Sequence, residues 1–559
     1  MARDPDEGDA YVFDLVDDDA PGDAAPAEAA DGASEGHELR ESMVSASGSP
    51  GRKRRTTAQV AAVLAIVLGT GLAVDGVRDS DRMQRMRDVP GGVTDLSAPL
   101  AQTWAWSGTV GTGESADDVV VLGDVLAFES DDGLVALDPA TGEEVWTVPL
   151  RHDADCGPMT TATWTRLAAS ELVCLQGAGP DREVVVVGPD GATSPPRALG
   201  VADTRRHGLP HTGPDGTVLR ARRVGPPSDV DVGTARCTES GECSGTVRAG
   251  RDLVLRAEDA ATGEERWTVT VPFRAAPAAQ CTRRFGGAWG SSENRLVLTG
   301  QLAPDAFGAR VKPGHIDVDG CGVQAGVTKE GALLGVDLEP GTGRVTDLDQ
   351  GGYVGTNFGG VARATLYAAD GGVVGEMIGY PMGPRTTDEV EPAMLFGVDE
   401  PGRRLRAYDL DGTPRWDITL QSGGQDFLAQ VGDTAVVTTG AGSVRGLDLA
   451  TGEERWTWDG TDSPPGDPGG YFGTVHVAQA FTDGELVLLL TEGDGGGTQG
   501  LVALDAGSGA VVWHREGGTQ VTSFDPSANG PVDQGIVGAL IAVDGHLLEV
   551  APRGVRGLG

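Results

Sequence analysis

The feature that most constrains the fold is a short pattern that recurs through the second part of the chain. Five copies match one another closely, and two weaker copies lie at Glu183–Leu199 and Ala332–Leu348. The close copies are GLVALDPATGEEVWTV (Gly133–Val148), VLRAEDAATGEERWTV (Val254–Val269), RLRAYDLDGTPRWDI (Arg404–Ile418), SVRGLDLATGEERWTW (Ser443–Trp458) and GLVALDAGSGAVVWHR (Gly500–Arg515). A repeat of this kind indicates similar units that share one core by packing against their neighbours.

Each copy has the pattern of a β-hairpin. An alternating apolar strand ends in Asp, whose carboxylate can accept a backbone N–H two residues further on. A Thr-Gly pair follows in most copies, and the Gly can take the positive φ that the turn needs. The return strand carries a Trp that can bury a large ring against an adjacent sheet. We therefore assign structural roles to Asp138, Asp259, Asp409, Asp448 and Asp505, and to Trp146, Trp267, Trp416, Trp456 and Trp513.

This motif resembles the tryptophan-docking repeat of the PQQ-like (quinoprotein alcohol dehydrogenase-like) β-propeller family, over about residues 102–559. Among its members the chain is most similar to non-enzymatic propellers such as the BamB-type lipoprotein of the outer-membrane barrel-assembly machinery. The resemblance implies an all-β ring of four-stranded antiparallel blades. It also implies an alternative function, because other members are quinone-dependent dehydrogenases of alcohols or sugars.

The number of blades follows from the spacing of the motif and from the two ends of the repeat region. Trp416 and Trp456 are 40 residues apart, which is about one blade, and seven hairpins result from the seven copies. An eighth would combine VRGLG (Val555–Gly559) with TWAWSG (Thr103–Gly108). We predict eight blades, with seven as the alternative, and a ring closed by Trp104, Trp106, Val555 and Leu558.

The region before the repeats is divided by its charge. Residues 1–55 form an acidic tail that ends in a basic cluster, and we expect the tail to be disordered. Residues 56–77 begin with 19 uncharged residues, which predicts a transmembrane helix, with a cleaved signal peptide as the alternative. The preceding basic cluster places the N-terminus in the cytoplasm. Residues 78–101 are then a polar linker, and the propeller is extracytoplasmic on a single-pass anchor in the cell membrane.

The composition limits the kinds of ligand and cross-link that we expect in this chain. The chain has 43 Lys and Arg against 83 Asp and Glu, a net charge of −40, which excludes non-specific nucleic-acid binding. The six cysteines favour disulfides in an exported domain over a metal site. Cys237 with Cys243, and Cys281 with Cys321, are candidate pairs.

No residues stand out as catalytic, cofactor-binding or metal-binding. Asp317 and Asp319 precede Gly320 as in the first part of a calcium loop, but the remaining ligands are missing, and a solvated turn is favoured. Vicinal cysteines and an Asn-Asp calcium pair, which the resemblance implies for quinone enzymes, are also missing. We therefore expect no cofactor and no enzymatic activity.

The remaining candidates are surface residues. The repeat spacing leaves excess length near residues 201–250, 303–330 and 376–403, which we interpret as recognition loops. Aromatic and Met residues among glycines and prolines suggest partner contacts at Tyr353, Phe358, Tyr380 and Met382. The sequence thus predicts a monomeric propeller that binds unidentified proteins of the cell envelope as a scaffold, or a ligand-sensing ectodomain as the alternative.

Overall fold

A computed structural model of the chain describes residues 79–559 apart from short gaps. The gaps are 112–118, 132, 152–153, 159–168, 178–181, 239–240, 287–294, 299–300, 313, 336–337, 339–342, 349–350, 358–362, 390–393, 400–402, 421–425, 440–442, 461–475, 493–498 and 516–537. The predicted tail and membrane helix lie outside the described residues. None of the helices in the described part is long and apolar enough to cross a bilayer.

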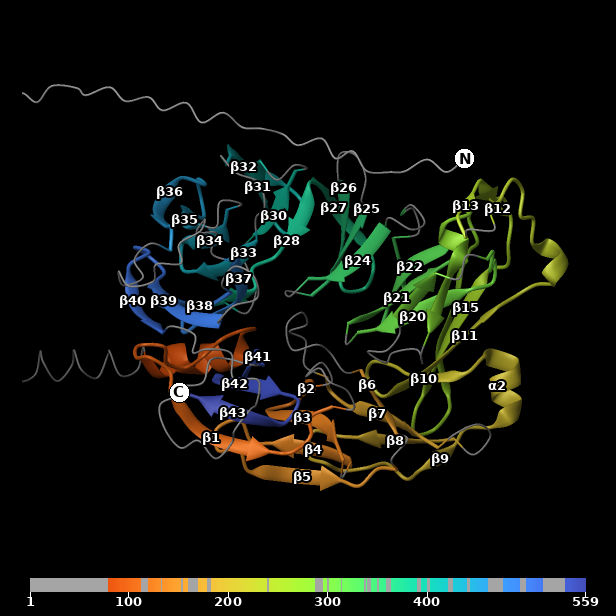
Figure 1. Ribbon diagram of the computed structural model, residues 1–559, viewed down its shortest axis with the longest axis horizontal. Coiled ribbons are helices and arrows are strands. Elements are labelled where there is room, and N and C mark those ends of the chain that lie inside the picture. The colour runs from red at the N-terminus through yellow and green to blue at the C-terminus, as the bar shows by residue number, and fades with distance from the viewer. Residues whose placement is uncertain are drawn as a thin grey trace, which may run out of the picture. The chain divides into compact units, whose positions relative to one another are not determined.

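The described residues form nine four-stranded antiparallel sheets, one of which gains a short fifth strand, and these are the blades of an all-β propeller (Figure 1). We number the blades in chain order, and blade 9 combines both ends of the repeat region. Blade 1 comprises β2 (Val119–Leu122), β3 (Val125–Ser130), β4 (Gly133–Leu137) and β5 (Glu144–Val148), and blade 2 comprises β6 (Asp155–Gly157), β7 (Leu172–Gln176), β8 (Glu183–Val187) and β9 (Arg197–Ala198). Blade 3 comprises β10 (Pro210–Thr212), β11 (Thr217–Arg223), β15 (Leu253–Asp259) and β16 (Glu265–Val271), and blade 4 comprises β20 (Phe307–Val311), β21 (His315–Gly320), β22 (Val323–Thr328) and β23 (Leu333–Leu334).

The other five blades follow the same order from first to fourth strand, except that a fifth strand joins blade 7 in parallel. Blade 5 comprises β24 (Gly343–Asp347), β25 (Tyr353–Asn357), β26 (Arg363–Tyr367) and β27 (Val373–Ile378), and blade 6 comprises β28 (Tyr380–Met382), β30 (Leu395–Val398), β31 (Arg404–Tyr408) and β32 (Pro414–Thr419). Blade 7 comprises β29 (Thr386–Thr387), β33 (Phe427–Val431), β34 (Thr434–Thr438), β35 (Val444–Asp448) and β36 (Glu454–Trp458). Blade 8 comprises β37 (His476–Thr482), β38 (Leu486–Glu492), β39 (Gln499–Asp505) and β40 (Val511–Arg515), and blade 9 comprises β41 (Ala539–Val543), β42 (His546–Ala551), β43 (Gly554–Leu558) and β1 (Gln102–Ser107).

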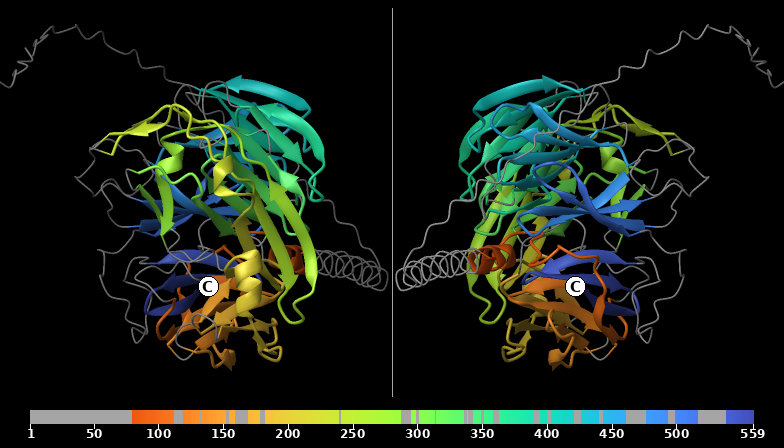
Figure 2. Two further views of the ribbon diagram at one scale, coloured as in Figure 1. Left: turned by 90° about the vertical axis from the view of Figure 1, so that its right-hand side faces the viewer. Right: turned by 90° about the vertical axis from the view of Figure 1, so that its left-hand side faces the viewer.

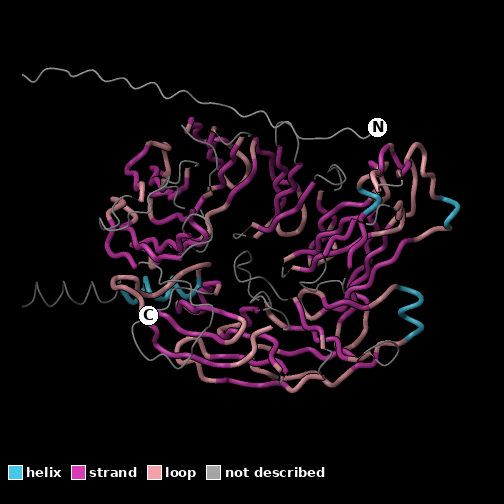
Figure 3. The backbone as a smooth tube through the Cα atoms, in the orientation of Figure 1, coloured by secondary structure: helices cyan, strands magenta, loops and turns pink. Residues whose placement is uncertain are grey.

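The remaining elements are short (Figure 3). A helix at 79–88 precedes the first strand, and α2 (Val201–His207) leads into blade 3. Outside the blades lie β12 (Arg236–Cys237), β13 (Cys243–Ser244), β14 (Thr246–Val247), β17 (Ala276–Pro277), β18 (Arg283–Gly286), β19 (Arg295–Leu298), and the 3-10 turns η2 (Pro227–Asp229) and η3 (Gln280–Thr282).

The predicted closure of the ring is confirmed. β1 pairs antiparallel with β43, so that Trp104 lies opposite Gly557 and Trp106 opposite Val555, while Gln102 pairs with Leu558. The Ala101 and Gly559 backbones also exchange two hydrogen bonds, of 2.8 and 2.9 Å. One blade therefore contains both ends of the repeat region, and the ring has no open end.

The prediction of eight or seven blades is wrong, because one blade lacks the motif. The weak copy at Ala332–Leu348 is not a hairpin: β23 ends blade 4 and β24 begins blade 5. The fourth strand of blade 5 is β27, which has Gly375, opposite Leu366 of β26, where the five close copies of the motif have Trp. A count based on tryptophan therefore assigned the residues of blades 4 and 5 to a single blade.

A tryptophan on the fourth strand of five blades contacts the turn of the following blade. The indole Nε1 donates to a backbone carbonyl in the turn between the third and fourth strands of the following blade, and the turn's glycine faces the ring. The pairs are Trp104 with Pro139 (3.2 Å), Trp146 with Pro189 (2.9 Å), Trp267 with Lys329 (2.8 Å), Trp416 with Leu449 (2.9 Å) and Trp456 with Ala506 (3.0 Å). These contacts run in one direction around the ring, so at these five junctions the same ends of the two blades lie on the same face.

Residues 93–100, within the predicted linker, take part in the ring. In blade 8, Trp513 donates to the carbonyl of Leu96 at 2.7 Å. No turn joins the third and fourth strands of blade 9, because β43 and β1 come from different parts of the chain, and Leu96 supplies the acceptor in its place. Val93, Leu96 and Leu100 are buried in a cluster with Leu488, Trp513, Leu540 and Leu547. This segment therefore completes the last junction between blades.

Candidate functional site

The main departure from a plain propeller is an insertion of residues 224–252 between β11 and β15 of blade 3, which we call the arm. Within it β12 pairs with β13, and β14 pairs with β17, which follows β16. Few apolar side chains support it: Ala235, Val247, Ala276, Ala278 and two cysteines form its buried cluster. A core this small needs cross-links to hold one conformation.

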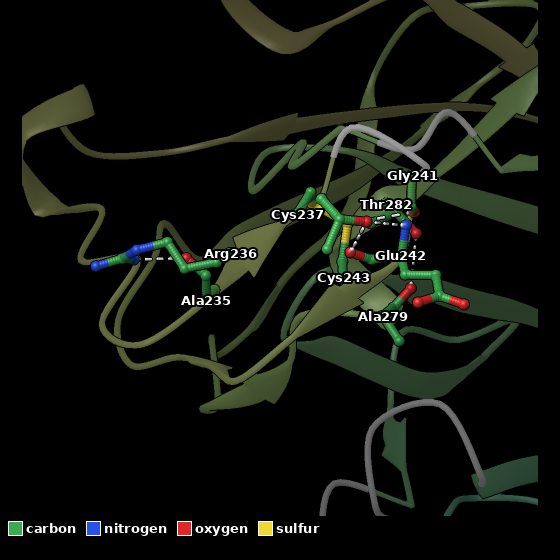
Figure 4. Close-up of a disulfide and its surroundings, with 9 residues drawn as sticks. Ala235, Arg236, Cys237, Gly241, Glu242, Cys243, Ala279 and Thr282 are labelled. Atoms are coloured by element: carbon green, nitrogen blue, oxygen red, sulfur yellow. Dashed lines mark hydrogen bonds between the residues drawn. A yellow bond between two sulfur atoms is a disulfide. The ribbon is translucent and has the colours of Figure 1, made fainter. Parts of the chain in front are cut away.

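Disulfides supply those cross-links, and both predicted pairs are confirmed. Cys237 and Cys243 close the β12–β13 hairpin (Figure 4), and Cys281 of η3 is bonded to Cys321 at the β21–β22 turn of blade 4. The sequence left Cys156 and Cys174 unpaired, and they join β6 to β7 inside blade 2. Two of the three disulfides therefore hold the arm and its base.

A buried arginine fixes the base of the arm to blade 4. Arg223 at the end of β11 donates to the carbonyls of Cys321 at 2.8 Å, Ala306 at 3.2 Å and Arg251 at 2.7 Å. Burial lowers the pKa of Arg223 to about 10, so its side chain stays charged at neutral pH. Because a charged group buried without partners is costly, these carbonyls and the guanidinium hold one another in place.

The outer surface of the arm is polar and exposed. Arg236, Thr238, Glu242, Ser244 and Thr246 are exposed, on a backbone that the Cys237–Cys243 bond and two short ladders hold. A surface that is ordered before binding loses less conformational entropy when a partner arrives. The arrangement can therefore present a fixed set of hydrogen-bonding and charged groups to a protein.

A second cluster of polar groups lies between blades 4 and 5. His315 of β21 is fully buried, and its Nδ1 lies 2.6 Å from Asp347 of β24 while its Nε2 lies 3.0 Å from Asp317. Lys312 pairs with the second oxygen of Asp317 at 3.1 Å. The hydroxyl of Tyr353 on β25 donates to Gly314 at 3.0 Å.

Interactions between charged groups outweigh burial in setting the pKa values of this cluster. Burial alone would lower the pKa of His315, but the bonds to Asp317 and Asp347 outweigh it and raise the pKa to about 9. Burial also acts to raise the pKa of Asp317, and its bonds to His315 and Lys312 lower it to about 2. The imidazolium therefore bridges two carboxylates across a junction that has no tryptophan.

The repeat aspartates hold turns, as predicted. Asp138 Oδ1 accepts the backbone N–H groups of Ala140 at 2.8 Å and Thr141 at 2.9 Å, and Asp259, Asp448 and Asp505 make equivalent bonds. Asp409 differs, because its carboxylate pairs with Arg415 at 2.5 Å and the turn is held by Asp411.

The residues suggested as partner contacts occupy different environments. Tyr353 is 5% exposed, so the structure places it in the interior and not on a contact surface. Met382 packs partly against the core of blade 6, Tyr380 is half-buried in β28, and Phe358 lies outside the described residues. Asp317 and Asp319 lie in strand β21, so the expected solvated turn is wrong. Residues 303–330 are largely blade 4 and not a recognition loop, whereas the excess near 201–250 includes the arm.

A quinone cofactor and its calcium would need a vicinal cysteine pair and a cluster of oxygen ligands. All six cysteines form disulfides between residues 18, 6 and 40 positions apart, so they cannot form a vicinal pair. In the described part of the chain, His, Cys, Asp and Glu side chains form no group of three that could hold a metal. The described residues therefore lack the vicinal-cysteine disc that a quinone would need here.

The fold and the tryptophan contacts define the class: an all-β propeller of nine blades in the described residues, with repeats that resemble the PQQ-like kind and with a cross-linked arm. A family described as outer membrane protein assembly factor BamB matches residues 364–546, about a third of the chain, which lie in blades 5 to 9. This match confirms the predicted resemblance.

The solved structures that match the chain include a BamB protein and an alcohol dehydrogenase. BamB from Moraxella catarrhalis is 15% identical, with 82% of this chain and 97% of that chain covered and a TM-score of 0.33. Quinohemoprotein alcohol dehydrogenase from Comamonas testosteroni is 12% identical, with 82% and 76% covered and a TM-score of 0.31. At these values the likeness supports no functional assignment. No curated protein matches the chain.

Proposed function

We propose that this chain is a membrane-anchored, extracytoplasmic propeller that binds other envelope proteins as a scaffold, with the arm as its main contact surface. The rigid arm is the observation on which the proposal depends: an exposed polar projection held by disulfides and by the buried Arg223. Loops held on a rigid scaffold are where binding usually occurs. The BamB family match to residues 364–546 supports an interaction module over a plain structural ring.

The membrane part of the proposal comes from the sequence. Residues 56–74 carry no charge and follow four consecutive basic residues, which favours an uncleaved anchor with the propeller outside the cytoplasm. Disulfides fit that side, because they persist in oxidising compartments. An anchored scaffold meets envelope partners at a raised effective concentration.

The test is photocrosslinking in intact cells. A photoreactive residue replaces Thr238 on the arm, and a matched one replaces Val512, which is exposed on the outer strand of blade 8. We expect discrete protein adducts from position 238 and at least tenfold less from position 512. Equal adducts from both positions, or none from the arm, would overturn the arm as the contact surface.

Two disulfide variants test whether crosslinking at the arm depends on its Cys237–Cys243 bond. Cys237→Ser/Cys243→Ser frees the tip of the arm, whereas Cys156→Ser/Cys174→Ser removes a disulfide inside blade 2. The first pair should reduce the adduct severalfold while leaving the thermal unfolding of the ring unchanged, and the second should leave the adduct in the fraction that stays folded. Turnover of alcohols or sugars by purified protein supplied with the quinone and Ca²⁺ would replace the scaffold proposal with an enzymatic one.

A further inference from the structure

Residues 79–96, which we call the coupler, are fixed to the propeller by hydrogen bonds to three blades. Met86 is fully buried, and Arg82 donates to the carbonyl of Asp483 at 3.0 Å. Thr94 donates its backbone N–H to Gly545 at 2.9 Å. Thr386 of β29 donates its hydroxyl to Pro90 at 3.1 Å. The coupler therefore contacts blades 7, 8 and 9 together.

Asp483 is the centre of this attachment. It is 2% exposed, and its carboxylate accepts backbone N–H groups from Glu485 at 3.0 Å, Leu486 at 2.7 Å and Leu96 at 3.0 Å. Arg82 lies 3.7 Å from the same carboxylate. A buried carboxylate with this many donors holds its surroundings in one geometry, because losing any of them leaves charge unpaired.

A glycine allows the coupler to lie close to the ring. A Cβ at Gly545 would lie 2.6 Å from Cγ2 of Thr94, which is too close for any other residue without a shift. The coupler and Thr482 of β37 share two backbone hydrogen bonds: Val93 N–H donates to Thr482 O at 2.8 Å, and Thr482 N–H donates to Gly91 O at 3.1 Å. The contacts cover the coupler from its helix to residue 96, so no free joint separates residue 82 from the blades.

The coupler and the arm lie on opposite faces of the ring. The coupler contacts the turns that join first to second strands, at β37–β38 and β41–β42, whereas the arm is inserted between the second and third strands of blade 3. In antiparallel blades those two connections lie at opposite strand ends. Figure 2 agrees, with the helix at 79–88 (red) and β12–β13 (yellow-green) on opposite sides.

We propose that the coupler is a rigid joint that holds the propeller in one orientation on the membrane, with the face of the first-to-second-strand turns toward the lipid and the arm facing away. This inference depends on the anchor in the proposed function, because the helix at 79–88 begins two residues after the predicted membrane segment ends at Val77. A partner then meets the arm at a fixed height and angle.

Ion pairs and the length of the helix both contribute to the proposed joint. Two acidic residues in the turns of the membrane-side face are paired with arginines, Asp433 with Arg455 at 2.5 Å and Glu485 with Arg82 at 3.9 Å. The second of these pairs joins the face to the coupler. The helix at 79–88 is about 15 Å long at 1.5 Å per residue, so a rigid joint of this length would hold the ring at a distance from the lipid.

The experiment uses the full chain in nanodiscs that contain anionic lipid. Hydrogen exchange of residues 82–96 measures the joint, and electron microscopy of single particles measures the angle between ring and disc. We expect exchange as slow as in blade 8 and one dominant orientation. Arg82→Ser/Met86→Ser should speed exchange in this segment at least a hundredfold and spread the orientations, while Gln84→Ser on the exposed side of the helix should change neither.

The outcomes separate this inference from the proposed function. Alkaline extraction and protease protection first establish whether the chain spans the membrane. If it does, fast exchange in the unchanged chain or several orientations would overturn the rigid joint and leave the scaffold proposal standing. If the chain is extracted, the anchor fails and the orientation fails with it, whatever the exchange shows. If Arg82→Ser/Met86→Ser exchanges as slowly as the unchanged chain, these contacts do not form the joint.

Discussion

Blades 7 and 8 differ from blades 4 and 5 in what joins each to its successor. Trp456 of blade 7 is 8% exposed and lies against Gly509 in the turn of blade 8. In blade 4 the equivalent place is taken by Leu334, whose side chain lies under Gly371, and His315 adds a charged bridge to Asp347. The comparison teaches that every junction between blades is filled, and that the indole is one of several ways to fill it.

Blade 5 shows the opposite extreme. At the place of the tryptophan it has Gly375, and a Cβ there would lie 1.9 Å from the carbonyl oxygen of Asp411 in the turn of blade 6. The turn itself therefore occupies the space that a ring fills elsewhere. The hydroxyl of Tyr408 closes the junction, since it donates to Ile378 O at 3.0 Å and accepts from Ile378 N–H at 3.2 Å.

The largest effect should come from emptying an indole site. Trp456→Ala removes a buried ring and the hydrogen bond to Ala506, so we expect the free energy of unfolding to fall by about 3–5 kcal/mol. Urea unfolding followed by circular dichroism measures it. Val512→Ala, at an exposed position on blade 8, should shift stability by less than about 0.5 kcal/mol. Similar shifts for the two variants would mean that the indole does not support its junction.

The junction between blades 4 and 5 should respond to pH in a way that an indole junction cannot. The pKa of His315 is raised from 6.5 to about 9 in the folded chain, so its contribution is complete below pH 6.5 and is lost as the pH rises through 9. We expect a loss of up to about 3 kcal/mol across this range. His315→Gln should remove that slope, whereas Trp456→Ala should retain it. A slope that persists in His315→Gln would assign the titration to another group.

The sequence predicted the features that short stretches of residues mark, and it missed those that depend on contacts between distant residues. The closure by Trp104 and Val555, the turn role of Asp138 and the Cys237–Cys243 disulfide all follow from local patterns. Blade 5 was missed because backbone contact at Gly375 has no residue signature, and only tertiary structure brings Asp411 there. The same limit applies to the His315 cluster, whose carboxylates come from different blades, and to the arm's base, where Arg223 reads as one more polar residue.

A smaller effect tests the close contact in blade 5. Gly375→Ala puts a methyl group where the carbonyl of Asp411 lies, so the turn has to move, and we expect a loss of about 1–3 kcal/mol. Gly507→Ala is a matched control, because a Cβ there meets only Asp505 at 3.6 Å. Thermal and urea unfolding of the two variants measure the difference. A neutral Gly375→Ala would show that this junction is loosely packed.

The smallest effect concerns the junction between blades 2 and 3, which contains neither an indole, as in blade 7, nor a glycine in close backbone contact, as in blade 5. Arg197 occupies the tryptophan's place: its Nε donates to Ala260 O at 2.7 Å, and Gly263 faces its guanidinium. Its Nη2 also pairs with the buried Glu258 at 3.2 Å, which keeps a second partner in Arg220 at 3.3 Å.

Arg197→Ala should therefore cost only about 1–2 kcal/mol in urea unfolding, because Glu258 stays paired. Arg197→Trp should recover most of that loss, since an indole N–H can donate to the same carbonyl over the same glycine. Arg206→Ala, at an exposed position on α2, should change nothing measurable. If Arg197→Trp is less stable than Arg197→Ala, the geometry of blade 2 is specific for a guanidinium, and its junction is a third kind and not a substituted indole site.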